Sequence, residues 1–194
     1  EKALEKDGLI FLSAQMDPNV NNPSPKDIYS IGVTAKIIRT AKSDDQNMKV
    51  IVEGKRRARV IEYLSTVPFY QVLAKIVQDV EDHSPEAKDL HKRVLALFEE
   101  YLKIHQSANV DSIVSALKDN SPERVSDIIA SHLYLPLEEK QNILETVNSL
   151  ERLRRLNFVL ENEILKLRAR FKHETPKGAR RKSGGYGDQG QQVF

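Results

Sequence analysis

The spacing of apolar residues changes part-way along the chain and divides it into a strand-like part and a helical part. In the first part apolar and polar residues alternate, and a period of two is typical of half-buried strands. Gly54 interrupts the alternation of the stretch 49–64 and predicts a bulge or bend there. The even-numbered positions of that stretch hold its apolar face: Val50, Val52, Ala58 and Val60.

Three further stretches of the first part are expected to form strands. Residues 9–12 are a short apolar run, and 28–41 is a longer candidate that a turn-like segment at 43–47 separates from 49–64. Residues 69–77 carry apolar side chains on both faces. A strand of that kind is usually flanked by other strands, so we expect this one to be interior.

The second part has the apolar spacing of three and four that is typical of helices. Ser84 before Pro85 has the composition of a helix N-cap and first turn. The same signal at Ser121-Pro122, and a related one at Leu135-Pro136, predict two more helix starts. A long last helix is expected from about residue 149 to residue 171.

These elements predict an α+β protein with three segments. A β subdomain spans 1–80, a helical bundle spans 84–171, and 172–194 is expected to be a flexible tail because Pro176 and several glycines cannot continue a helix.

The last helix carries an apolar stripe with repeats of seven, which is the pattern of a coiled-coil seam. The predicted seam consists of Leu153, Asn157, Leu160, Ile164 and Leu167, where the asparagine would fix the register. The alternative, which we favour, is that this helix packs on its own bundle.

Charge is concentrated at the end of the chain. The net charge of +2 combines +7 in residues 164–182, −1 in 183–194 and −4 in 1–163. A mildly acidic body does not favour a broad nucleic-acid interface. The basic run 55–59 is split by alternation over two strand faces, so we expect it to be solvated.

No catalytic or metal-binding constellation is visible in the sequence. The chain has no cysteine, and none of its five histidines is paired with another at helical spacing. Residues 178–183 end in Lys-Ser but lack the glycine spacing of a phosphate-binding loop. His132 lies in an apolar stretch, and we expect it to be a buried structural histidine. We therefore expect no enzymatic activity and no cofactor in this chain. With no secretory signal and no apolar run of membrane-spanning length, we expect a cytoplasmic protein with no membrane partner.

Several segments together resemble the amino-terminal domain of the ATP-dependent Lon proteases. Their order and spacing carry the resemblance over about residues 1–171. The segments are 8–15, 28–33, 52–60, 68–70, 127–133, 138–145 and 152–153.

The resemblance implies a PUA-like β-barrel followed by a helical bundle. It also implies a non-catalytic domain that captures unfolded or degron-bearing proteins and supports assembly of a homohexamer. In the family, ATP, Mg²⁺ and the Ser/Lys dyad belong to downstream modules. The family has a Leu/Pro-rich strand segment that would precede Glu1, and residues 1–6 resemble the end of the helix that follows it.

Three aromatic residues near strand ends are candidates for contact with substrate: Tyr63, Phe69 and Tyr70. The alternative is that they are core aromatics. Two other functions stay open at this point, a stand-alone adaptor that binds a partner protein or small ligand, and a nucleic-acid binder that uses the PUA-like fold and the basic tail.

Overall fold

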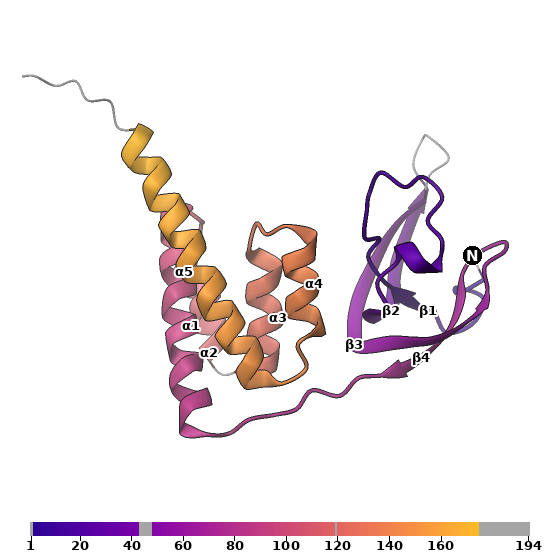
Figure 1. The fold of residues 1–194 in the computed structure, drawn as a ribbon, viewed down its shortest axis with the longest axis horizontal. Helices are drawn as coiled ribbons and strands as arrows, with labels where there is room; N and C mark the ends of the chain where they lie inside the picture. The colour runs from indigo at the N-terminus through magenta and orange to yellow at the C-terminus, as the bar shows by residue number, and fades with distance from the viewer. Residues whose placement is uncertain (1, 43–47, 119, 175–194) are drawn as a thin grey trace, which may run out of the picture.

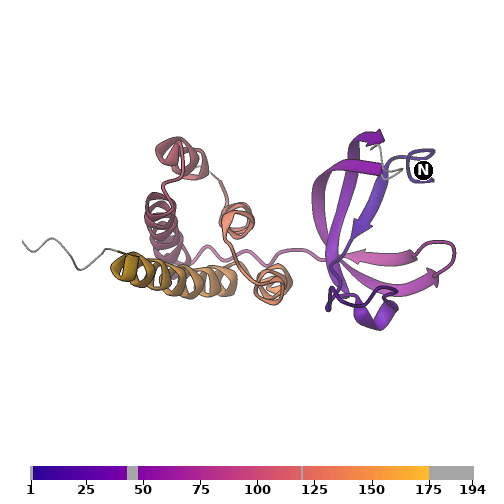
Figure 2. The same ribbon diagram turned by 90° about the horizontal axis from the view of Figure 1, so that it is seen from above.

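The protein consists of a sheet lobe followed by a helical lobe, which lie side by side along the longest axis (Figures 1 and 2). The computed structural model describes residues 2–42, 48–118 and 120–174. The sheet lobe spans residues 2–76 and the helical lobe 85–174, with the linker 77–84 between them. The α+β class is confirmed.

The described part of the sheet lobe is a four-stranded antiparallel sheet in the order β1-β2-β3-β4. A short 3₁₀ turn, η1 at Pro25–Asp27, precedes the second strand. The strands are β1 Leu9–Leu12, β2 Ile31–Lys42, β3 Met48–Ser65 and β4 Gln71–Ile76.

The long strand β3 bends and belongs to both leaves of the sheet (Figure 1). Its residues 48–59 pair with β2, and its residues 58–65 pair with β4. In the described chain, β1 pairs only with β2 and β4 only with β3, so the sheet has two free edges and is not a closed barrel.

Two sequence expectations for this lobe are wrong. The strand expected at 69–77 is not interior, because β4 lies at the edge of the described sheet and its apolar Leu73 is 51% exposed. Residues 2–7 form turns and not the end of a helix.

The described helical lobe contains five helices. They are α1 Pro85–Ile104, α2 Val110–Lys118, α3 Pro122–His132, α4 Leu137–Glu145 and α5 Ser149–Glu174. The hydroxyl of Ser84 accepts a hydrogen bond from the Ala87 N–H (3.2 Å), so the predicted N-cap is confirmed. α5 continues through Glu174, three residues further than expected, and the rest of the predicted tail, 175–194, lies outside the described residues.

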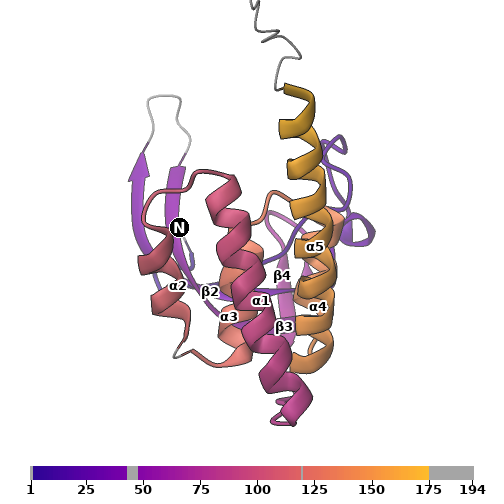
Figure 3. The same cartoon turned by 90° about the vertical axis from the view of Figure 1, so that its left-hand side faces the viewer.

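The main hydrophobic core lies entirely in the helical lobe, where α1 packs along α5 (Figure 3). The sequence stripe of α5 supplies one wall of this core. His132 at the end of α3 is exposed and not buried as expected. Its ring still packs edge-on against Phe98, with centroids 5.8 Å apart, and its Nδ1 lies 2.9 Å from the Ile128 carbonyl oxygen.

Candidate functional site

A bulge in β3 decides which side chains face each side of the sheet. Ala35 pairs with Gly54 and Thr34 with Arg56, so Lys55 is an extra residue. Side chains alternate between the two faces of a strand, so one extra residue moves the even-numbered residues after it to the face that the odd-numbered residues before it occupy. Gly54 was expected to mark such a bulge, which is confirmed, but Ala58 does not share a face with Val52 as the alternation suggested.

One face of the sheet is directed at the helical lobe. Gln141 on α4 is buried, and its Nε2 donates to the Ile31 carbonyl oxygen of β2 at 2.9 Å. Arg57 of β3 is on the same face, and its Nε donates to the Leu144 carbonyl oxygen at 2.9 Å. The two lobes therefore touch through polar contacts.

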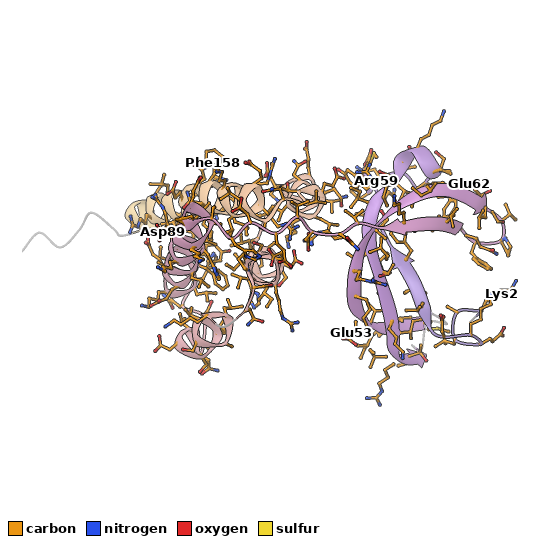
Figure 4. All side chains as sticks on the ribbon, turned by 90° about the horizontal axis from the view of Figure 1, so that it is seen from below. Lys2, Glu53, Arg59, Glu62, Asp89 and Phe158 are labelled. Carbon is orange, nitrogen blue, oxygen red and sulfur yellow. The ribbon has the colours of Figure 1, made fainter. Side chains whose placement is uncertain are left out.

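The opposite face of the sheet encloses an open cavity of about 1040 Å³, which we call the trough. It lies between the leaf formed by β1 and β2 and the leaf formed by β3 and β4. Lys2 lies at its rim, on the side of the sheet away from the helices (Figure 4). The strand residues that line the trough include Phe11, Thr34, Val60, Tyr63, Val72 and Ala74, and Phe69 and Tyr70 before β4 line it too.

The three predicted aromatic residues are brought together in the trough. The rings of Tyr63 and Tyr70 meet edge to face with centroids 5.8 Å apart. The Tyr70 hydroxyl donates to the Pro23 carbonyl oxygen, which holds that ring at the rim. Phe69 and Tyr70 are each 40% exposed, so neither is a fully buried core aromatic. Their contact with substrate stays a prediction.

Among the described residues, the full charges that line the trough are all positive. The charged residues of this lining are Lys2 and Lys6. The Lys2 Nζ lies 5.2 Å from the centroid of the Phe69 ring, within the range of a cation–π contact. Burial, and then the neighbouring Tyr70, raise the pKa of Tyr63. Its phenol therefore stays neutral and can donate a hydrogen bond at neutral pH. The trough is apolar with a cationic rim.

The sheet lobe has little core of its own. Among its described residues, the buried apolar ones are Ile31, Ala35 and Ala58. Of the 19 exposed large hydrophobic side chains in the described chain, 15 lie at or before Val80. Exposed apolar side chains usually mark an interaction site where they are contiguous, and the trough gathers three of them, Leu9, Phe69 and Tyr70. This is the reason to place the functional site on the sheet lobe.

The sequence did not reveal the ionic cluster that joins the lobes. Arg57 Nη1 donates to both carboxylate oxygens of Asp79 at 3.0 Å, and its Nη2 pairs with Asp127 on α3. Arg152 on α5 pairs with the same Asp79, and its Nε donates to the Thr146 carbonyl oxygen at 2.7 Å. We call Arg57, Asp79, Asp127 and Arg152 the junction cluster. The expectation that Arg57 lies on a solvated face is wrong, because the side chain is only 6% exposed.

Most of the predicted coiled-coil seam is used inside the chain. Leu153, Leu160, Ile164 and Leu167 are buried in the helical core, which agrees with the favoured alternative. The side-chain oxygen of Asn157 is also buried and has no hydrogen-bond partner among the described residues. An intermolecular seam at these positions stays a prediction, and the structure offers it no exposed apolar stripe there.

Two further features of the described residues concern metal binding and membrane insertion. No group of three or more histidines or carboxylates lies close enough together to hold a metal ion within those residues. None of the described helices combines the length and the apolar character that crossing a membrane requires.

Comparison with known proteins identifies the family. The family model described as the ATP-dependent protease La (LON) substrate-binding domain matches residues 1–162. The chain belongs to the Lon substrate-binding domain family. It is 35% identical over 167 residues to a Lon protease of Solibacter usitatus and 37% identical over 171 residues to one of Heliobacterium modesticaldum. Each alignment covers 86% of this chain but 21% of the relative, so the chain spans about a fifth of their length.

A solved Lon domain has the same fold. The N-terminal domain of Mycobacterium avium complex Lon protease superposes with a TM-score of 0.60 at 22% sequence identity. The match covers 80% of this chain and 90% of that one. The Lon resemblance inferred from the sequence is confirmed at the level of family and fold.

Proposed function

We propose that this chain is the substrate-recognition module of an ATP-dependent Lon-type protease and that the trough binds unfolded or degron-bearing segments of protein substrates. The observation that carries the proposal is the apolar, aromatic-lined trough on the free face of the sheet. A folded protein hides its large apolar side chains, whereas an unfolded chain exposes them. A surface that gains free energy from apolar contact therefore selects unfolded segments.

The chemistry of the trough suits binding and not catalysis. The described residues of its lining include two lysines and no histidine or carboxylate, so they offer no acid–base pair that could act near neutral pH. In this proposal the chain carries no cofactor. Unfolding and cleavage, with their ATP, Mg²⁺ and catalytic residues, belong to modules beyond the region that the chain covers. Substrate recognition by this chain is then part of protein quality control in the cytoplasm.

Assembly is the second part of the proposal. Lon relatives are about four times as long as this chain, and we propose that the complete protein assembles as a homohexamer to which this module contributes. α5 is the element of the described chain that extends furthest from its lobe (Figure 1), which suits a connection to a neighbouring module.

A binding measurement with matched variants tests recognition. The probe is a fluorescently labelled model protein that is kept unfolded by reduction and alkylation of its cysteines. Phe69→Ser removes an aromatic ring from the trough, and we expect it to weaken binding by about ten-fold, because burying one such ring contributes roughly 1.5–3 kcal/mol. Phe158→Ser is the control, since this ring is 66% exposed on the outer side of α5 (Figure 4).

The outcomes separate the alternatives clearly. Weaker binding for the Phe69 variant alone supports recognition by the trough. Equal affinities for both variants and the wild-type chain would place the binding surface elsewhere. Failure of the folded wild-type chain to bind at high micromolar probe would remove the proposal that it recognises substrates by itself.

A further inference from the structure

The linker between the lobes is fixed by backbone hydrogen bonds on both sides. The Val77 N–H donates to the Arg57 carbonyl oxygen of β3 at 3.0 Å, which ties the start of the linker to the sheet lobe. The Ser149 N–H at the start of α5 donates to the Val80 carbonyl oxygen at 2.9 Å, which ties the rest of the linker to the helical lobe. Residues 78–79 are all that lies between these two anchors.

Gln78 and Asp79 have the backbone freedom that a hinge needs. In the part of the chain that the structure describes, neither residue forms a hydrogen bond with another backbone group. Hinges are a few loop residues whose φ and ψ angles absorb the movement of one rigid body against another. A rotation at these two residues therefore turns one lobe against the other and leaves the backbone hydrogen bonds of both lobes in place.

The boundary between the lobes is polar. The main hydrophobic core contains residues of the helical lobe alone, so this core does not extend across the boundary. Among the described residues, the side-chain hydrogen bonds that cross it are those of Arg57 and the bond from Gln141 to the Ile31 carbonyl oxygen. Lobes that meet without a large apolar interface are expected to move relative to each other unless another contact holds them.

The junction cluster is that contact. Arg57 is its member from the sheet lobe, and within the described residues this one side chain forms every ion pair that crosses the boundary. It pairs with Asp79 in the linker and with Asp127 on α3. Because Asp79 also pairs with Arg152 on α5, a residue of the hinge is bonded to both lobes.

We propose that residues 78–79 are a hinge and that the junction cluster is a latch, which holds the lobes in the arrangement of Figure 2. When Arg57 leaves the cluster, the sheet lobe rotates relative to α5 while both lobes stay folded. This inference goes beyond the proposed function, because it does not depend on what the sheet lobe binds.

The charges left behind by such a release stay compensated. Arg152 keeps Asp127 within the helical lobe, where its Nη1 lies 3.6 Å from the Asp127 Oδ1. Arg57 itself exchanges its buried partners for water. In a buried ion pair the loss of hydration offsets much of the attraction, so the closed and open arrangements lie close in free energy.

The distance between the lobes tests the proposal. The chain has no cysteine, so Glu53→Cys on β3 and Asp89→Cys on α1 place one spin label on each lobe (Figure 4). Both side chains are exposed, and a second pair, Glu62→Cys with Asp89→Cys, detects rotations that leave the first distance unchanged. Double electron–electron resonance then measures the distribution of distances between the labels. We expect one narrow distribution for each pair when the junction cluster is intact.

Arg57→Gln removes the charge that crosses the boundary. We expect the open arrangement to rise from less than about 10% of the molecules to most of them, seen as a second, broad population of distances. Arg56→Gln is the matched control, because this neighbouring arginine of β3 is exposed and forms no ion pair among the described residues. Circular dichroism checks that the variants keep their secondary structure.

Three results would overturn the proposal. The first is the same distribution in folded Arg57→Gln and Arg56→Gln, and the second is a broad distribution while the cluster is intact. If Arg57→Gln does not fold, Arg57→Lys replaces it, since an ammonium group keeps the charge but lacks the fork that bonds several carboxylate oxygens at once. Partial opening of this variant supports the latch. The third contradicting result is an unchanged distribution, or loss of folding again, in Arg57→Lys.

The test is independent of substrate binding. Rejection of the latch would leave the proposed recognition function standing. Loss of probe binding by the sheet lobe would likewise leave the latch standing, so the two failures are distinguishable.

Discussion

Neutralising Asp79 should destabilise the fold far more than removing an exposed carboxylate. Asp79 lies in the linker and faces two guanidinium groups, Arg57 with 6% and Arg152 with 0% of the side chain exposed. Asp79→Asn keeps the shape of the side chain and removes its charge. Asp127 would then be the remaining carboxylate of the junction cluster, and its side chain is 50% exposed.

The magnitude follows from the burial of the two arginines. Breaking a buried ion pair by removing one partner typically costs 3–5 kcal/mol, because the other charge stays buried and uncompensated. Asp79 is itself 27% exposed and Asp127 stays in place, so we expect about 2–4 kcal/mol. That is a large share of the roughly 5–15 kcal/mol by which a domain is usually stable.

Urea unfolding followed by far-ultraviolet circular dichroism measures this difference. Glu86→Gln is the matched control, because Glu86 pairs with Arg154 on the surface, where the side chains are 58% and 45% exposed. An exposed pair usually contributes less than about 1 kcal/mol. If both variants lose the same small amount, the junction cluster does not stabilise the fold and the reasoning is refuted.

Three further predictions concern the two lobes. Leu160→Ala should lower the free energy of unfolding in urea by about 2–5 kcal/mol without changing the sedimentation coefficient, because Leu160 is fully buried. Its control, Leu165→Ala, should lower it little, because Leu165 is 61% exposed. A dissociated oligomer with unchanged stability would instead support the coiled-coil seam. Gly32→Ala should destabilise the sheet by about 1–3 kcal/mol, since an added Cβ would lie 2.1 Å from the Leu12 carbonyl oxygen. Gly54→Ala is the control, because the nearest atom to its added Cβ would lie 3.4 Å away. Equal losses of unfolding free energy in the two variants would contradict this prediction. Burial lowers the pKa of His91 although Glu123 opposes the shift, so the folded state favours neutral imidazole and stability should fall as pH drops below about 6.5. His91→Gln should show a smaller fall in unfolding free energy over that range, and an unchanged pH profile would contradict the assignment.

The helical lobe was largely predictable because its signals are local. Ser84 and Pro85 mark a helix start within a few residues, and the spacing of three and four marks the face of α5 that becomes core. α2 was not predicted, because Val110 is not preceded by the Ser-Pro signal that marks α1 and α3. Periodicity also could not decide whether the apolar stripe of α5 packs within the chain or between chains.

The sheet lobe was harder because its arrangement depends on distant pairing. The alternation predicted for β3 applies up to Gly54, but the extra residue Lys55 moves the side chains after it to the opposite face of the sheet. The position of that extra residue is fixed by the pairing of β3 with β2. The aromatic residues of the trough could be selected from the sequence, whereas the nearness of Lys2 to Phe69 could not. The junction cluster joins residues up to 95 positions apart in sequence, Arg57 and Arg152, and no local signal predicts such a contact.

The most direct test of the account is to map where an unfolded polypeptide touches this chain. Backbone amide NMR signals of the isotopically labelled protein are followed while an unlabelled, unfolded probe protein is added. The account predicts that the signals that change belong to trough residues such as Phe11, Val60 and Ala74, while those of the helical core stay in place. Changes confined to the outer side of α5, around Phe158, would contradict the claim that the sheet lobe recognises substrates.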